Sequence, residues 1–90
     1  MKLLLNGNGK NNMQTNNLYS TKDLYTASFL YAKGIKLNST DKQGKVCWFV
    51  FEDKTHCERL IQSYLAKTEM VVAKDFTDAV RTLKDLVFQN

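Results

Sequence analysis

Residues 35–51, IKLNSTDKQGKVCWFVF, decide the fold of this 90-residue chain. The first half alternates apolar and polar residues, the second half is rich in β-branched and aromatic residues, and a turn sequence separates them, so the stretch predicts a β-hairpin. A three-residue loop at residues 42–44, with glycine in its left-handed position, pairs Asn38 with Trp48. A two-residue loop would instead mix polar side chains with Phe49, so we favour the longer loop.

The two faces of this predicted hairpin differ in composition. One face carries the residues that we expect in the core: Ile35, Leu37, Ser39, Cys47, Phe49 and Phe51. The other face carries three apolar and three polar residues: Val46, Trp48, Val50, Lys36, Asn38 and Thr40. A two-stranded ribbon is only marginally stable on its own, so a helix must cover at least one face. The face with Trp48 either lies under another part of the chain or stands exposed.

One helix is predicted before the hairpin. Ser20 and Asp23 form a loose capping box at its start, and Gly34 supplies the left-handed residue that ends it. The helix should therefore span residues 21–33. Its apolar arc is wider than a surface helix needs, which is typical of a central helix.

Two further helices are predicted after the hairpin. The first starts at an explicit capping box, Thr55 and Glu58, and its apolar residues recur at helical spacing: Cys57, Leu60, Ile61, Tyr64 and Leu65. The second spans residues 73–88 and has a continuous apolar stripe: Phe76, Ala79, Val80, Leu83, Leu86 and Val87. The fold class is thus α+β in the order helix, two-stranded antiparallel hairpin, helix, helix (α-β-β-α-α).

The pattern predicts a short arm and one domain. Residues 1–18 hold six Asn and few apolar residues, so they cannot bury enough surface to offset the entropy of ordering and should form a flexible arm. Residues 19–90 should form a single α+β domain. The longest apolar run, residues 46–51, is far shorter than the roughly 18–20 residues of a membrane span. The apolar start of the chain is too short for a signal peptide, and we expect a cytoplasmic protein.

No group of residues meets the geometric requirements of catalysis or metal binding. His56 and Cys57 are adjacent, so on a helix they point about 100° apart and cannot act as a base and its nucleophile. The segment at residues 7–10 lacks the spacing of a phosphate-binding loop. Glu52 and Asp53 lie where they can approach the positive start of a helix. Two cysteines without paired spacing do not form a zinc site. We expect no enzymatic activity, no metal and no cofactor.

Positive charge is concentrated in the first half of the chain. The net charge is +4; residues 1–45 hold seven Lys and two Asp, whereas residues 46–90 hold six Lys or Arg and seven Asp or Glu. Such an excess attracts phosphate groups or an acidic protein surface. A tryptophan nearby can stack on bases or fill a protein hot spot. The predicted partner-binding residues are Lys33, Lys36, Lys42, Lys45, Trp48 and Val50.

Four segments resemble a small domain family of unknown function from bacteria, phages and prophages. They are YSTKDLY at residues 19–25, AKG at 32–34, VCWFVF at 46–51 and RTLKDL at 81–86. The resemblance covers roughly residues 19–88. It implies a mobile-element origin and the same order of elements, and it carries over no active site.

We therefore expect a non-enzymatic small binding protein, encoded by a phage or mobile element, that acts on nucleic acid or on a nucleic-acid-processing machine. One alternative, suggested by the resemblance, is an inhibitor of a bacterial defence system such as a CRISPR nuclease. Another is a structural homodimer that buries Val46, Trp48 and Val50 against a second copy. The expected partner is nucleic acid itself, a protein of a nucleic-acid-processing or defence complex, or that second copy, and no membrane is involved.

Overall fold

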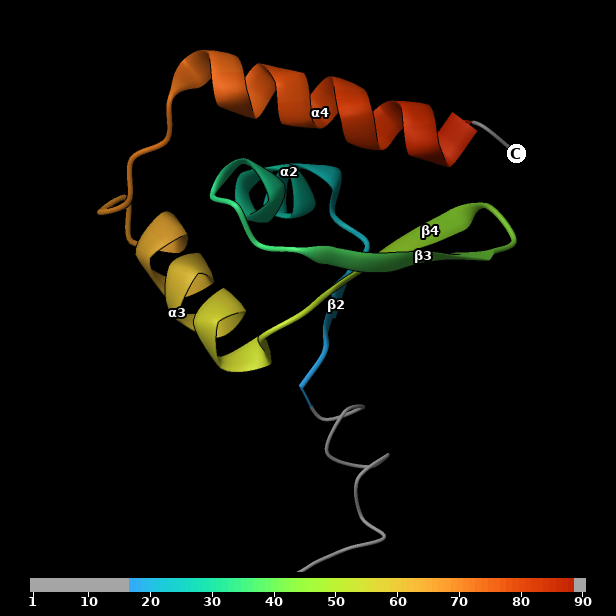
Figure 1. Ribbon diagram of the computed structural model, residues 1–90, viewed down its shortest axis with the longest axis horizontal. Coiled ribbons are helices and arrows are strands. Elements are labelled where there is room, and N and C mark those ends of the chain that lie inside the picture. The colour runs from blue at the N-terminus through green and yellow to red at the C-terminus, as the bar shows by residue number, and fades with distance from the viewer. Residues whose placement is uncertain (1–16, 89–90) are drawn as a thin grey trace, which may run out of the picture.

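The computed structural model describes residues 17–88, and its sheet is built around β4 (Val46–Phe51). β3 (Leu37–Gln43) and β2 (Tyr19–Thr21) pair with β4 on either side, so the sheet is antiparallel in the order β2-β4-β3 (Figure 1). The α+β class is confirmed, and the predicted helix, hairpin and two helices occur in that order. The predicted flexible arm falls almost entirely on residues 1–16, outside the described residues.

The segment that was predicted to cap and begin the first helix forms the strand β2 instead. Tyr19 pairs with Phe51 and Thr21 pairs with Phe49, which gives the second edge of β4 a backbone hydrogen-bond partner. The helix α2 (Leu24–Ala32) begins only after Asp23, whose carboxylate accepts a 2.8 Å hydrogen bond from the backbone N of Thr26. The predicted capping box at Ser20 is therefore wrong, because aromatic and β-branched residues before Asp23 extend the sheet instead.

The hairpin loop has two residues, Gly44 and Lys45, not the predicted three. Gln43 pairs with Val46 across it, and Gly44 has a φ of 63°, a conformation that glycine adopts readily. The shorter loop changes the register, so the predicted pairing of Asn38 with Trp48 is also wrong. A β-bulge between Leu37 and Ser39 then shifts the register back, which returns Leu37 to the core face opposite Phe51.

The helices pack on the sheet and on one another. α2 packs against α4 (Ala73–Phe88), whose predicted bounds are confirmed, and against α3 (Lys54–Leu65). α2 and α4 lie on the same side of the hairpin (Figure 1). Among the described residues, no helix is long and apolar enough to cross a membrane.

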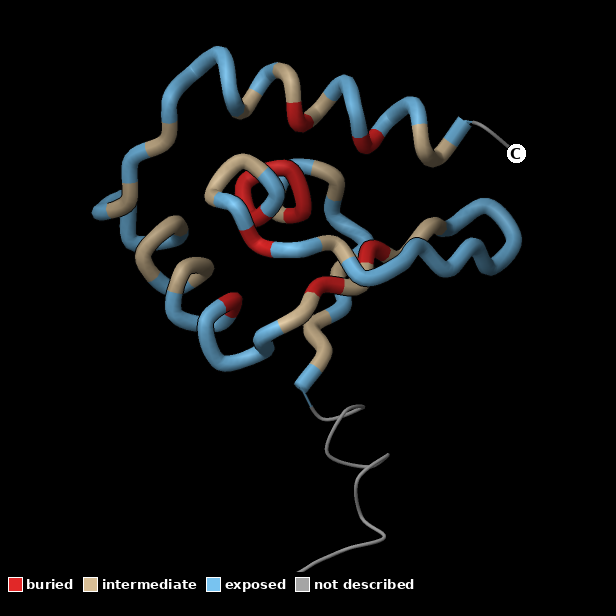
Figure 2. The backbone as a smooth tube through the Cα atoms, in the orientation of Figure 1, coloured by how far each residue is buried: buried red, intermediate tan, exposed pale blue. Residues whose placement is uncertain are grey.

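The core lies between β4 and the helices. Buried residues of α2, β4 and α4 occur where these elements face one another (Figure 2). The cluster comprises Ala27, Phe29, Leu30, Ile35, Phe49, Phe51, Cys57 and Leu83. Tyr64 of α3 stacks on Phe29 with ring centres 4.5 Å apart, so α3 closes this core. Leu65, predicted on the buried stripe of α3, is 72% exposed because it lies in the last turn, beyond the residues that contact the core.

α3 begins two residues earlier than the capping box predicted. Its N-cap is Asp53, which accepts a 3.3 Å hydrogen bond from the backbone N of His56. Asp53 has a φ of 64°, a left-handed conformation that Asp tolerates better than most residues. The expected placement of Asp53 at the positive start of the helix is thus confirmed, and the predicted cap at Thr55 is wrong.

Candidate binding surface

The side of β4 that faces away from the helices carries Val46, Trp48 and Val50, and we call it the outer face. Val46 is exposed and the other two are half-buried; none of the three belongs to the core cluster. The register places Asp41 opposite Trp48 and Ser39 opposite Val50. Of the predicted neighbours on this face, Thr40 was wrong, because it pairs with Phe49 on the core side.

Lys22 contributes the nearest positive charge to the outer face. Its Nζ lies 6.0 Å from the centre of the Trp48 ring, within the range of a cation–π contact. The β2–β4 register explains this placement, because continuing the pairing of Thr21 with Phe49 brings Lys22 beside Trp48. The sequence prediction did not include Lys22, since the contact requires a strand that the sequence pattern did not indicate.

Lys22 also reaches a second feature, a groove of about 220 Å³ between the hairpin end and the end of α4. Three lysines from separate parts of the chain border this groove: Lys22, Lys45 and Lys84. Its other lining residues are apolar or weakly polar: Leu24, Cys47, Phe49, Val87 and Phe88. We call it the lysine groove. Among residues 17–88 no carboxylate lines it, so the three ammonium groups create a positive potential around an apolar floor.

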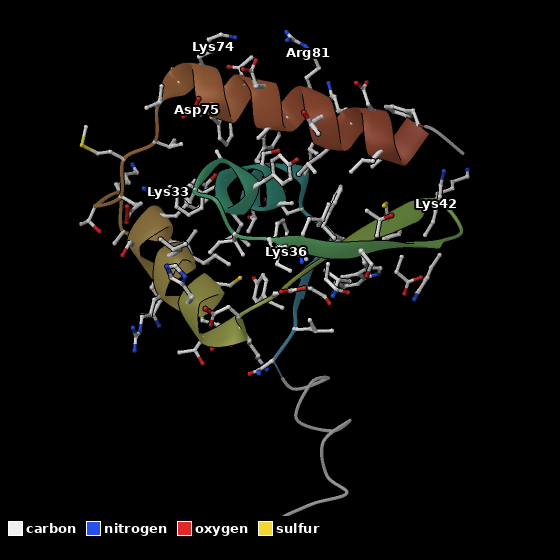
Figure 3. All side chains as sticks on the ribbon, in the orientation of Figure 1. Lys33, Lys36, Lys42, Lys74, Asp75 and Arg81 are labelled. Carbon is white, nitrogen blue, oxygen red and sulfur yellow. The ribbon has the colours of Figure 1, made fainter. Side chains whose placement is uncertain are left out.

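The predicted lysines are spread over the molecule. Lys45 lines the lysine groove, and Lys42 lies near it because its Nζ donates a 3.1 Å hydrogen bond to the carbonyl of Val87. Lys33 lies away from Lys42 (Figure 3); its Nζ makes a 2.9 Å ion pair with Glu69 and donates to the carbonyl of Met70. Lys33 therefore links α2 to the α3–α4 connection.

Lys36 and Lys84 lie in different parts of the structure. Lys36 is exposed in the segment between α2 and β3 (Figure 3). Lys84 was not among the predicted partner-binding residues, yet it borders the lysine groove because α4 ends beside the hairpin. On the same helix, Asp78 pairs with Lys74 at 3.1 Å and with Arg81 at 3.7 Å.

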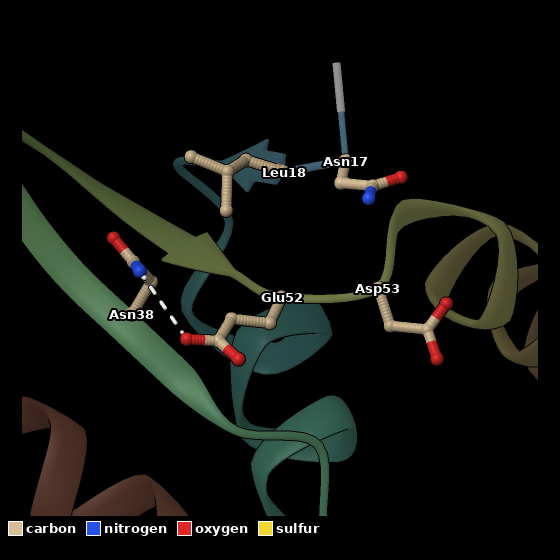
Figure 4. A pocket seen from close by; sticks show the side chains of 5 residues that line it. All are labelled: Asn17, Leu18, Asn38, Glu52 and Asp53. Carbon is tan, nitrogen blue, oxygen red and sulfur yellow. Dashed lines mark hydrogen bonds between the residues drawn. The ribbon is translucent and has the colours of Figure 1, made fainter. Parts of the chain in front are cut away.

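A larger hollow of about 630 Å³ has the opposite electrostatic character. It is lined by Asn17, Leu18, Asn38, Glu52 and Asp53 (Figure 4). Asn38 donates a 3.3 Å hydrogen bond to Glu52, and Asp53 caps α3. These two carboxylates disfavour an anion here. The hollow therefore differs from the lysine groove in the charge of the ligand that it suits.

The thiol of Cys57 is held in its neutral form. Cys57 is 0% exposed and its Sγ donates a 3.4 Å hydrogen bond to the carbonyl of Glu52. Burial, with smaller contributions from the carboxylates of Asp53 and Glu58, raises the pKa of Cys57 to about 11. A nucleophilic cysteine needs a depressed pKa and access to solvent, so this thiol lacks both properties.

His56 is exposed, and its Nδ1 lies 3.8 Å from the carboxylate of Asp53. That contact belongs to the helix cap and does not involve the Cys57 thiol. Within residues 17–88, no group of three or more His, Cys, Asp or Glu side chains could hold a metal ion.

A comparison with known protein families shows to which family the chain belongs. The family described as "Domain of unknown function (DUF5659)" matches residues 16–89. The chain belongs to this family. The DUF5659 match agrees with the resemblance in the sequence to a domain family of unknown function, and it covers all of the helices and strands described here. Neither the curated proteins nor the solved structures include a significant match to this DUF5659 chain.

Proposed function

We propose that this DUF5659 domain is a non-enzymatic binding module that recognises a polyanionic partner, either nucleic acid or an acidic protein of a nucleic-acid-processing complex. The observation that carries the proposal is the convergence of Lys22, Lys45 and Lys84 on one groove to which residues 17–88 contribute no carboxylate. Lys42 adds a fourth positive charge nearby. A cytoplasmic location and the bacterial or phage origin implied by the resemblance belong to the same proposal.

Trp48 connects this charge to a surface that can contact a partner directly. The contact with Lys22 joins the outer face to the lysine groove around the end of the hairpin. An accessible indole can stack on a base or on an apolar side chain, and both contacts are typical of residues that dominate binding energy. Asp41 lies opposite Trp48 and Glu52 lies farther along the sheet, and both carboxylates limit the positive potential there. Binding should therefore centre on the lysine groove.

Fluorescence of Trp48 tests the proposal because it is the only tryptophan. A single-stranded oligonucleotide and polyglutamate would each be titrated at several salt concentrations. For a strand that contacts the three groove lysines, the logarithm of affinity should fall with the logarithm of salt with a slope of about −2. Lys45→Gln should make that slope less steep, whereas Lys54→Gln, an equal change of charge at the start of α3, should not. Failure of both polyanions to bind at low salt would overturn the proposal.

The apolar floor of the lysine groove favours a second candidate function, inhibition of a protein such as a nuclease of a bacterial defence system. A protein inhibitor should bind its target in the absence of nucleic acid, and binding should persist better at high salt because apolar contacts are not screened. Measurement of target binding after nuclease treatment separates this candidate from direct nucleic-acid binding. Loss of binding on nuclease treatment would contradict it.

A further inference from the structure

We propose that the lysine groove binds an acidic peptide segment of a protein partner, with one apolar side chain of that segment seated on the groove floor and its carboxylates paired with Lys22, Lys45 and Lys84. This inference rests on the proposed binding function and specifies the chemistry of the partner. The groove lies between the hairpin and α4, and its floor includes Cys47, Phe49 and Val87.

The size of the groove indicates what can enter it. Its volume of about 220 Å³ is below the roughly 300–1,000 Å³ of sites that enclose drug-sized ligands. An entire amphipathic helix face requires several anchor positions in a longer groove. A single leucine- or phenylalanine-sized side chain, carried on an extended or irregular segment, matches the available space.

The floor favours an apolar group over a nucleobase because it is mainly apolar and two of its polar atoms already have partners. The thiol of Cys47 lies 4.0 Å from the carbonyl of Trp48 as a weak hydrogen-bond donor, and the carbonyl of Val87 accepts a hydrogen bond from Lys42. A base seated there would leave the polar atoms of its edge without partners, which is costly in a desolvated site. An apolar side chain incurs no such cost.

The rim explains why the flanking residues of the peptide should be acidic. Lys22, Lys45 and Lys84 come from the β2–α2 connection, the hairpin loop and α4, and within the described part of the chain, residues 17–88, no carboxylate shares their groove. Repulsion between three ammonium groups falls when carboxylates lie between them. All three lysines are exposed, so a partner can reach them without rearrangement of the core.

Two fluorescent peptides of equal length and charge test the inference with the full chain. Both are rich in Asp and Glu; one has a central phenylalanine and the other a serine at that position. The phenylalanine peptide should bind about tenfold or more tightly, since one buried aromatic side chain accounts for a difference of that order. The double variant Lys45→Gln, Lys84→Gln should weaken its binding about tenfold, and Lys54→Gln should leave it unchanged.

Nuclear magnetic resonance provides a second measurement that does not depend on the variants. The phenylalanine peptide should shift the amide signals of Leu24, Cys47 and Val87 most strongly. Equal affinity of the two peptides, or shifts confined to the outer face, would overturn the inference and leave the proposed function standing. Displacement of the peptide by an oligonucleotide that shifts the same signals more strongly would assign the groove to nucleic acid and overturn it as well. Failure of both peptides, polyglutamate and the oligonucleotide to bind would overturn both proposals.

Discussion

The strand β4 presents two different surfaces from six consecutive residues. Phe49 and Phe51 are 2% and 0% exposed and belong to the core, whereas Val46 on the outer face is 40% exposed. Both surfaces are rich in apolar side chains, so composition alone does not separate them. The difference arises because α2 and α4 pack on only one side of the strand (Figures 1 and 2). Alternation along a strand thus separates residues that hold the fold from residues available to a partner.

The largest effect should follow substitution on the core face. Phe51→Ala removes a fully buried ring beside Tyr19 of β2 and leaves a cavity, which should lower the free energy of unfolding by about 3–5 kcal/mol. Small domains have about 5–15 kcal/mol in total, so much of the stability should be lost. Urea denaturation followed by circular dichroism measures this.

A matched substitution tests whether the loss of stability requires that the removed ring be buried. Phe88 is 79% exposed at the end of α4, so Phe88→Ala should change the free energy of unfolding by no more than about 0.5 kcal/mol. If the two variants lose similar stability, the assignment of Phe51 to the core is incorrect.

The next effect concerns pH and the buried thiol of Cys57. Its pKa is raised from 9.0 to about 11 in the folded chain, mainly by burial, so the unfolded chain releases its proton first as pH rises. The contribution of this thiol to stability should therefore be constant below pH 9 and fall between pH 9 and about 11. The full effect is up to about 2–3 kcal/mol, since one pKa unit corresponds to about 1.4 kcal/mol.

Cys57→Ala is the control for this titration. Burial also raises the pKa of Tyr19 above its ordinary value of 10.0, so part of the alkaline loss should remain in that variant. Urea midpoints measured across the alkaline range distinguish the two groups. An unchanged pH dependence in Cys57→Ala would show that the thiol is not responsible.

A smaller effect is expected at Asp53, where the chain leaves β4 and enters α3. Asp53→Ala removes a helix cap, which costs about 1 kcal/mol, and keeps a β-carbon in the left-handed conformation, which alanine tolerates less well than aspartate. Asp53→Gly also loses the cap, but glycine adopts the left-handed conformation readily. The Gly variant should therefore be more stable than the Ala variant. Asp23→Ala, at a cap with ordinary φ, should show the cap cost alone. Equal stability of the Ala and Gly variants at position 53 would contradict this account.

The elements with strong local signals were predicted well. The bounds of α4 were predicted correctly because a continuous apolar stripe defines it from Ala73 to Phe88. The strand β2 was missed, since Tyr19 to Thr21 is too short to show periodicity and is defined by its pairing with β4. The two-residue loop and the bulge near Asn38 belong to the pairing of β3 with β4. The longer loop was favoured because it kept polar side chains away from Phe49, and that argument did not include a bulge, which returns Leu37 to the core face.

The same distinction applies to the candidate binding surface. Lys45, Trp48 and Val50 were named from the hairpin sequence, and the structure places them around its end and outer face. Lys22 was missed because it joins them through β2. Lys84 was also missed, because only tertiary packing brings α4 to the hairpin. Residues joined by long-range contacts leave no pattern in a single sequence.

The smallest effect should follow substitution on the outer face. Trp48→Thr keeps a β-branched residue in the strand and removes a half-buried ring with its contact to Lys22, so it should lower the free energy of unfolding by about 1 kcal/mol. Urea denaturation under the conditions used for Phe51→Ala gives the comparison. A loss as large as that of Phe51→Ala would mean that a second copy or residues 1–16 cover this face in solution. A second copy covers the outer face if the urea midpoint rises with protein concentration and sedimentation gives a doubled mass. Residues 1–16 cover it if the loss of stability disappears when those residues are removed.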